Sequence, residues 1–121
     1  MKVIYVAGAY RSSLGMWGVR ENIHAAMRVA RSIWEMGHAA ICPHGNTAYM
    51  DGGDIPAQMF LDGDLEIVRR CDAVFMLEGW RESQGAVGEY RFALEHEIPT
   101  FEDLMQLRLW LEESDGSVKQ T

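Results

Sequence analysis

Cysteines are scarce in this sequence, which argues against a disulfide framework and against a thiolate metal site. Cys42 and Cys71 are the two cysteines among 121 residues, and their spacing matches neither a metal-binding nor a redox motif. The first ten residues, MKVIYVAGAY, enter an apolar strand directly and do not have the form of a signal peptide. We therefore expect a cytoplasmic protein in which both cysteines are reduced core thiols.

Basic residues are also few, and no long apolar run is present. The chain has 11 Lys and Arg against 18 Asp and Glu, a formal net charge of −7, and no basic cluster. A nucleic-acid backbone or an anionic membrane is therefore a poor partner. No segment approaches the ~20 apolar residues that span a bilayer. A small anionic ligand remains compatible, because a few backbone amides and one arginine can bind a phosphate locally.

The apolar residues, 48% of the chain, are sufficient for one compact core. We expect one domain over residues 1–113 and a polar tail over residues 114–121. Apolar, β-branched runs alternate with amphipathic helical patterns along the domain. The expected strands cover about residues 2–7, 39–42, 72–77 and 99–101, and the expected helices about 18–36, 57–70, 84–97 and a last one ending near 113.

This alternation predicts an α/β fold, a flavodoxin-like or Rossmann-like parallel sheet of four to five strands with helices on both faces. In such a sheet the ligand lies at the carboxyl ends of the strands, where the strand order reverses. Three segments are expected to meet there, namely residues 8–16, 43–56 and 77–84. The second of them is long for a loop in a compact domain, and such loops are more often functional.

Asp64 lies near the middle of the apolar arc of the helix expected over residues 57–70. An inward-facing carboxylate has two interpretations. It is either a structural Asp that accepts hydrogen bonds from backbone amides, or a catalytic acid whose pKa is raised by burial. Asp62 and Glu66 project to the polar side of the same helix and are expected to be solvated.

Glu89 flanks the apolar stripe of the following helix, where a glutamate taken alone is usually a surface residue. The residues before it favour a different interpretation. Ser83 is a good N-cap, and Gly85 and Ala86 would let a ligand approach free amides at the helix start. Such a helix terminus suits a phosphate or a hydroxyl group.

The end of the first strand offers a second candidate ligand loop. Gly8, Ala9, Tyr10 and Arg11 resemble a phosphate or ribose loop, but they match neither the dinucleotide pattern GxGxxG nor the P-loop pattern. Nicotinamide-dinucleotide and P-loop functions are therefore disfavoured. Tyr5, on the same strand, is either a core residue or a group that orients a carboxylate.

The long loop carries polar groups that could contact a base, namely His44 and Asn46. Together with Asp51 and Asp54 they have the wrong spacing for zinc, so no metal is expected.

The four tryptophans divide into two pairs. Trp34 and Trp110 are expected in the core. Trp17 and Trp80 are expected in loops near the site, where either could stack on a base.

Three motifs resemble the nucleoside 2-deoxyribosyltransferase-like superfamily. They are YVAGAYR near the start, DLEIVRRCDAVFML with Asp64, and GWRESQGAVGEYRFAL with Glu89. The resemblance covers roughly residues 2–101 and is closest to the DUF4406-type branch. Its strongest part is a strand followed by S-x-G-A-x-x-E and a helix.

The resemblance implies a role for each matching residue. In that superfamily a glutamate attacks the anomeric carbon of deoxyribose, and Glu89 occupies the matching position. Tyr5 would then hydrogen-bond this glutamate, Asp64 would assist protonation of the leaving base, and Gly8 to Arg11 would lie near the sugar or phosphate. Cleavage of an N-glycosidic bond passes through an oxocarbenium-like state, which a carboxylate stabilises while an acid neutralises the departing base. No metal or organic cofactor is needed.

One position separates the subclasses of this superfamily. Six residues before the nucleophile, the transferases typically have an Asp that contacts the sugar 5′-hydroxyl, and the related 2′-deoxynucleoside 5′-monophosphate N-hydrolases have a Ser. Ser83 stands there in this chain, and a neutral hydroxyl tolerates a phosphate dianion. We therefore expect hydrolysis of a (deoxy)nucleoside 5′-monophosphate, with Ser83 and Arg11 at the phosphate. Base exchange between deoxynucleosides and a non-catalytic nucleotide-sensing module are the alternatives.

The resemblance also implies a homo-oligomer, a dimer or higher. Members of the superfamily complete the site with a residue from the C-terminal part of a neighbouring subunit. Ser114 and Ser117 are the available candidates for that role in the C-terminal tail.

Overall fold

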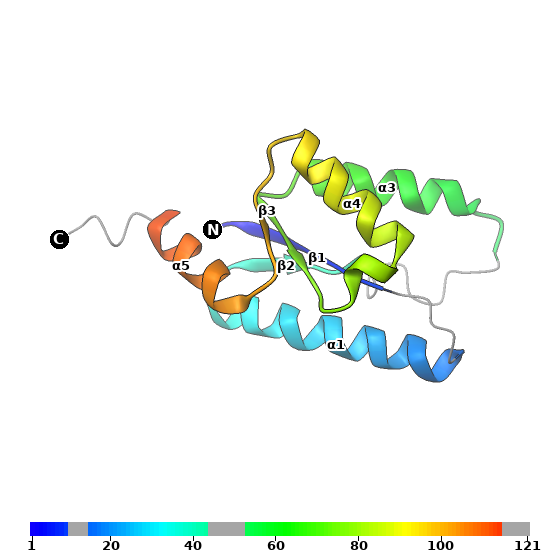
Figure 1. Cartoon of the computed structure of the whole chain (residues 1–121), viewed down its shortest axis with the longest axis horizontal. Helices are drawn as coiled ribbons and strands as arrows, with labels where there is room; N and C mark the ends of the chain where they lie inside the picture. The colour runs from blue at the N-terminus through cyan, green and yellow to red at the C-terminus, as the bar shows by residue number, and fades with distance from the viewer. Residues whose placement is uncertain (10–14, 44–52, 115–121) are drawn as a thin grey trace.

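The computed structural model describes residues 1–9, 15–43 and 53–114. Its centre is a parallel sheet of four strands in the order β2-β1-β3-β4 (Figure 1). The strands are β1 (Val3–Ala7), β2 (Ala39–Ile41), β3 (Ala73–Met76) and β4 (Thr100–Phe101). The helices are α1 (Met16–Glu35), α3 (Ala57–Arg69), the short 3₁₀ helix η1 (Trp80–Glu82), α4 (Gln84–Glu95) and α5 (Leu104–Ser114).

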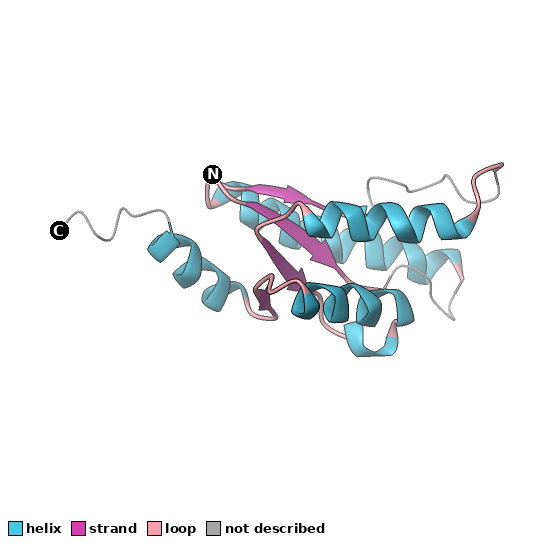
Figure 2. Ribbon diagram, turned by 90° about the horizontal axis from the view of Figure 1, so that it is seen from above, coloured by secondary structure: helices cyan, strands magenta, loops and turns pink. Residues whose placement is uncertain are grey.

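Helices cover both faces of the sheet, as predicted. Side chains along each strand alternate between the two faces, so each strand can contribute to a core on either side. In β1, Ile4 and Val6 point to a core shared with α1 and α5, while Tyr5 and Ala7 point to a core shared with α3 and α4. Figure 1 shows α1 on one side of the strands and α3 and α4 on the other, and Figure 2 shows the strands running in the same direction between them. The predicted α/β fold is therefore confirmed.

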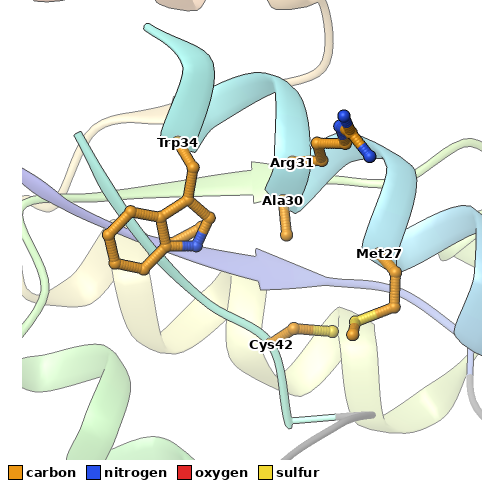
Figure 3. Close-up of a pocket in the computed structure, with 6 residues that line it drawn as sticks. Met27, Ala30, Arg31, Trp34 and Cys42 are labelled. Carbon is orange, nitrogen blue, oxygen red and sulfur yellow. The ribbon is translucent and has the colours of Figure 1, made fainter. Parts of the chain in front are cut away.

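The apolar face of α1 extends beyond the sheet, which corrects the expectation for Trp34. Ala26, Ala30 and Ile33 are buried, but Met27 is 50% and Trp34 55% exposed. The physical reason is that β2, the strand beside them, is short and forms the edge of the sheet. Met27 and Trp34 instead border an open groove of about 490 Å³ whose floor includes Ala30 (Figure 3).

The other expected core tryptophan does pack against the core. Trp110 on α5 is partly buried, and its ring lies 5.3 Å from that of Phe101 on β4, centroid to centroid. On α3 the expected apolar arc is only partly covered, because Val68 is buried but Leu61 is 49% exposed. Within the described ranges no helix is long and apolar enough to cross a membrane.

Candidate active site

The strand order reverses between β1 and β3, at the place predicted for the site. The chain leaves β1, forms α1 and β2 on one side, and then returns to form β3 on the other side of β1. Ala7 and Met76, the last residues of β1 and β3, are paired in register, and the Leu77 amide donates to the Ala7 carbonyl at 2.8 Å. The segment that follows β3 leads through η1 into α4, so α4 begins at this edge of the sheet (Figure 1).

Gly8 has a packing reason to be glycine at this edge. A Cβ on Gly8 would lie 2.6 Å from Leu77 Cδ1 and 2.8 Å from Leu77 Cβ, closer than such atoms approach. The lack of a side chain therefore lets the chain leave β1 directly beside the chain leaving β3. Contact of Gly8 or the half-buried Ala9 with a ligand stays a prediction.

The centre of the site is a hydrogen bond between β1 and α4. Tyr5 is completely buried, and its Oη donates to Glu89 Oε2 at 2.6 Å. Glu89 is 9% exposed, because α4 turns it inward together with Ala86 and Ala93, which lie three residues before and four residues after it. The contact that the resemblance implied between these two residues is present in the structure.

Burial makes ionisation of both groups less favourable. It raises the pKa of Glu89 to about 7; the hydrogen bond from Tyr5 acts in the opposite direction, and the charge of Asp64 raises the pKa further. Burial, followed by the charge of Glu89, also raises the pKa of Tyr5 far above its ordinary value. Tyr5 is therefore a permanent hydrogen-bond donor to Glu89 at physiological pH.

Asp64 lies on α3, which packs beside α4, and its carboxylate acts electrostatically on this pair. The side chain is half-buried, and burial raises its pKa to about 6. Among the described residues no backbone amide donates a hydrogen bond to the Asp64 carboxylate. Within the described ranges Asp64 therefore has none of the backbone hydrogen bonds of a structural Asp, and its role as an acid stays a prediction.

Ser83 is the N-cap of α4, as predicted. It has an extended backbone, and its Oγ accepts a hydrogen bond from the Ala86 amide at 3.2 Å. The cap corrects one expectation, because the Ala86 amide is occupied and the Ala86 side chain is 1% exposed. Gly85 is exposed at the first turn of the helix, and its contact with a ligand stays a prediction.

Trp80 does not offer its ring to a base, which corrects the expectation of stacking. The side chain is 5% exposed, and its ring centroid lies 4.6 Å from that of Tyr90 on α4. The cause is η1, a turn of helix that the sequence did not reveal and that directs the indole into the core shared with α3 and α4. Trp17, in contrast, is 62% exposed on α1, and its contact with a base stays a prediction.

Glu102, which no sequence pattern predicted, follows β4, and its carboxylate accepts hydrogen bonds from the indole N–H of Trp80 and from the guanidinium of Arg81. No local pattern marks it, because its partners are 22 and 21 residues away in the chain.

Four of the predicted site residues lie outside the residues that the structure describes: Tyr10, Arg11, His44 and Asn46. Ser117 also lies outside them, and Ser114 is the last residue of α5.

The described residues contain no cluster of three or more His, Cys, Asp or Glu side chains that could hold a metal ion. Neither Cys42 nor Cys71 forms a disulfide bond within the described part of the chain, and burial raises the pKa of Cys71 to about 11. The groove beside Trp34 lies on the other face of the sheet from Glu89, since its helical lining comes from α1 (Figure 3).

Comparison with known proteins agrees with this architecture. Residues 2–101 match the family described as a domain of unknown function, DUF4406. A 2-deoxyribosyltransferase from Bacillus psychrosaccharolyticus has a similar solved structure, with a TM-score of 0.60 and 18% sequence identity over 85% of this chain and 78% of that one. No curated protein matches the sequence. The chain therefore belongs to the DUF4406 family and has the fold of a 2-deoxyribosyltransferase.

Proposed function

We propose that this protein hydrolyses the N-glycosidic bond of a (deoxy)nucleoside 5′-monophosphate and releases the free base. The observation that carries the proposal is the buried pair of Tyr5 and Glu89 beside the carboxylate of Asp64. Ionisable groups are rarely buried without a partner that neutralises them, and clusters with shifted pKa values are typical of active sites. The similarity in fold to a 2-deoxyribosyltransferase supports chemistry at the same bond.

In this mechanism an oxygen of Glu89 attacks the anomeric carbon of the sugar, and the bond between that carbon and the base nitrogen breaks. Tyr5 holds the other carboxylate oxygen, Asp64 gives a proton to the leaving base, and water then displaces Glu89 from the sugar. That water returns a proton to Asp64, so the net reaction adds one water and yields a free base and a sugar phosphate. Separate nucleophile and acid roles for two carboxylates are those of a retaining glycosidase.

Both carboxyl groups change protonation state near neutral pH, because burial raises the pKa of Glu89 to about 7 and that of Asp64 to about 6. Positive charge that develops at the anomeric carbon stabilises the Glu89 anion and lowers its pKa. Asp64 can then hold the proton that the leaving base takes.

Ser83 supports a phosphorylated substrate. Its Oγ accepts the bond from the Ala86 amide, which leaves the hydroxyl hydrogen available to donate to a phosphate oxygen. The hydroxyl lies at the N-terminus of α4, where the helix dipole favours negative charge. Arg11 is proposed as the second phosphate ligand.

Base exchange is the second candidate, because the similar solved structure is that of a 2-deoxyribosyltransferase. The covalent sugar intermediate is the same, and a second base rather than water takes the sugar. A third candidate is a sensor that binds a nucleotide without turnover.

We also propose that the protein is cytoplasmic, that its substrate is a small molecule, and that it forms a homodimer or a higher oligomer. Apolar side chains exposed along α1 support self-association, since Met16, Trp17 and Met27 are 65%, 62% and 50% exposed. Light scattering coupled to size-exclusion chromatography tests the oligomeric state directly.

The function is tested by incubating the protein with a panel of deoxynucleotides, ribonucleotides and nucleosides and measuring free base by chromatography. Glu89→Gln keeps an acceptor for Tyr5 but removes the nucleophile, and we expect base release to fall on the order of 10³-fold or more. Glu95→Gln, an exposed position on the same helix, is the matched control and should retain full activity.

Each outcome selects one candidate. Release from monophosphates in water alone supports the hydrolase, and release only after addition of a second base supports the transferase. Binding without release from any substrate supports the sensor. Release that is undiminished in Glu89→Gln contradicts the mechanism.

A further inference from the structure

Glu102 is joined to the segment that leads into α4. It follows β4 in the chain, and its Oε1 accepts from Trp80 Nε1 at 3.2 Å and from Arg81 at 3.3 Å. Its Oε2 accepts from the other terminal nitrogen of Arg81 at 3.1 Å. These bonds, first from Trp80 and then from Arg81, hold the pKa of Glu102 below its ordinary value. Both partners belong to η1.

The bond from Trp80 outweighs the ion pair. The side chains of Arg81 and Glu102 are 69% and 48% exposed, and exposed ion pairs contribute little. The indole of Trp80 is 5% exposed, so loss of Glu102 would leave a buried N–H without its acceptor. The main effect of Glu102 is therefore to fix the ring of Trp80.

Trp80 in turn contacts α4 at two places, its N-cap and its middle. Its carbonyl accepts from the Ser83 amide at 3.0 Å, and Ser83 caps the Ala86 amide. Its ring packs against Tyr90, the residue after Glu89. The first turn of α4 and the turn that carries Glu89 are thus both fixed relative to η1.

We propose that Glu102 is a positioning residue for Glu89 and acts through the indole N–H of Trp80. When this bond is made, η1 keeps the Ser83 cap closed and keeps Glu89 against Tyr5. The kinetic consequence rests on the function proposed above, whereas the structural consequence does not.

The test compares Glu102→Ala with Glu102→Gln, which retains an acceptor for the indole but not the charge. The first measurement is amide hydrogen exchange in the protein without substrate. In Glu102→Ala we expect the Ser83 and Ala86 amides to exchange on the order of tenfold faster, with no comparable change in β1 amides such as Val6. Glu102→Gln should stay within about twofold of the parent protein, because it can still accept the indole bond.

Two further variants separate this role from simpler ones. Arg81→Ala removes the ion pair and also the guanidinium that lies 4.6 Å from the centroid of the Trp80 ring. We expect exchange at Ser83 to rise by less than about fivefold, because both contacts are exposed and the indole bond to Glu102 remains. Glu113→Gln, an exposed glutamate on α5, is the matched charge control and should change neither amide.

The second measurement is the pH dependence of base release. A displaced Glu89 would change its burial and its distance from Tyr5, so Glu102→Ala should shift the midpoint of the rate profile, and Glu102→Gln should restore it. Unchanged exchange at Ser83 and Ala86, or equal acceleration at β1, overturns the proposal. If no substrate releases base, the proposed function fails, and the exchange comparison still decides the role of Glu102.

Discussion

The two faces of the sheet bury different kinds of side chain, although they share the same strands. The face covered by α1 and α5 is packed with apolar residues such as Ile4, Val6 and Ile33. The face covered by α3 and α4 contains the hydroxyl of Tyr5 and the carboxylate of Glu89 within its core. Tyr5 lies between Ile4 and Val6 on one strand, so a single residue step separates the two environments.

The difference indicates how stability and function are divided in this molecule. Burial of apolar surface stabilises the fold, whereas burial of an ionisable group destabilises it unless the group is neutralised. The α1 and α5 face therefore carries stability, and the α3 and α4 face is where burial has raised the pKa values of Asp64 and Glu89. Substitutions at three positions can break or sharpen this comparison.

The largest expected effect is on the apolar face. Ile4→Ala removes a completely buried side chain, and we expect the free energy of unfolding to fall by about 3 kcal/mol, from lost burial and the cavity left behind. Urea denaturation measures the loss, and base release per folded molecule should stay at the parent level. A specific activity that falls together with stability would contradict the division between the faces.

The second prediction concerns the pH dependence of stability on the other face. Asp64 and Glu89 have raised pKa values in the folded protein, so the folded state binds their protons more tightly than the unfolded chain does. Their stabilising contribution is present at low pH, below the unfolded pKa values of about 4, and is lost as pH rises through about 6 to 7.

Glu89→Gln is neutral at every pH and should remove the larger part of this loss, on the order of 2 kcal/mol between pH 4.5 and 8. Denaturation series at several pH values provide the measurement, with Glu95→Gln as the control whose profile should match the parent. An equally steep profile in Glu89→Gln would show that Glu89 is not the source of the pH dependence.

The features that were predicted from the sequence depend on local pattern or on the family resemblance. The alternation of strands and helices gave the parallel sheet, and the turn chemistry around Ser83 gave the cap of α4. The contact between Tyr5 and Glu89 came from the resemblance, because the two residues are 84 positions apart and no periodicity relates them.

The features that were missed depend on what lies next to a residue in space. Periodicity states which side of a helix Trp34 occupies, but not that β2 is too short and too near the edge to cover it. The sequence predicts a loop around Trp80, whereas the structure has a turn of 3₁₀ helix there. Glu102, from a distant part of the chain, helps to stabilise this turn. Such contacts join residues that are far apart in the sequence, so neither composition nor spacing predicts them.

The smallest expected effect is at Ser83, where one substitution can separate the cap from the ligand. Ser83→Ala removes the hydroxyl that accepts from the Ala86 amide, and we expect a loss of about 1 kcal/mol in unfolding free energy. Ser32→Ala is the matched control on α1, where the hydroxyl only donates to the Arg28 carbonyl of its own helix. Its unfolding free energy should change by less than about 0.5 kcal/mol.

Ser83→Asp then isolates the ligand, because Asp is as good an N-cap as Ser but carries a negative charge. Stability should match the parent protein, while kcat/KM for a nucleoside 5′-monophosphate should fall at least about tenfold, because the carboxylate repels the phosphate dianion. The unphosphorylated nucleoside should be little affected, and both rates are measured as base release at fixed ionic strength. Equal losses on the two substrates would mean that Ser83 affects base release independently of the phosphate.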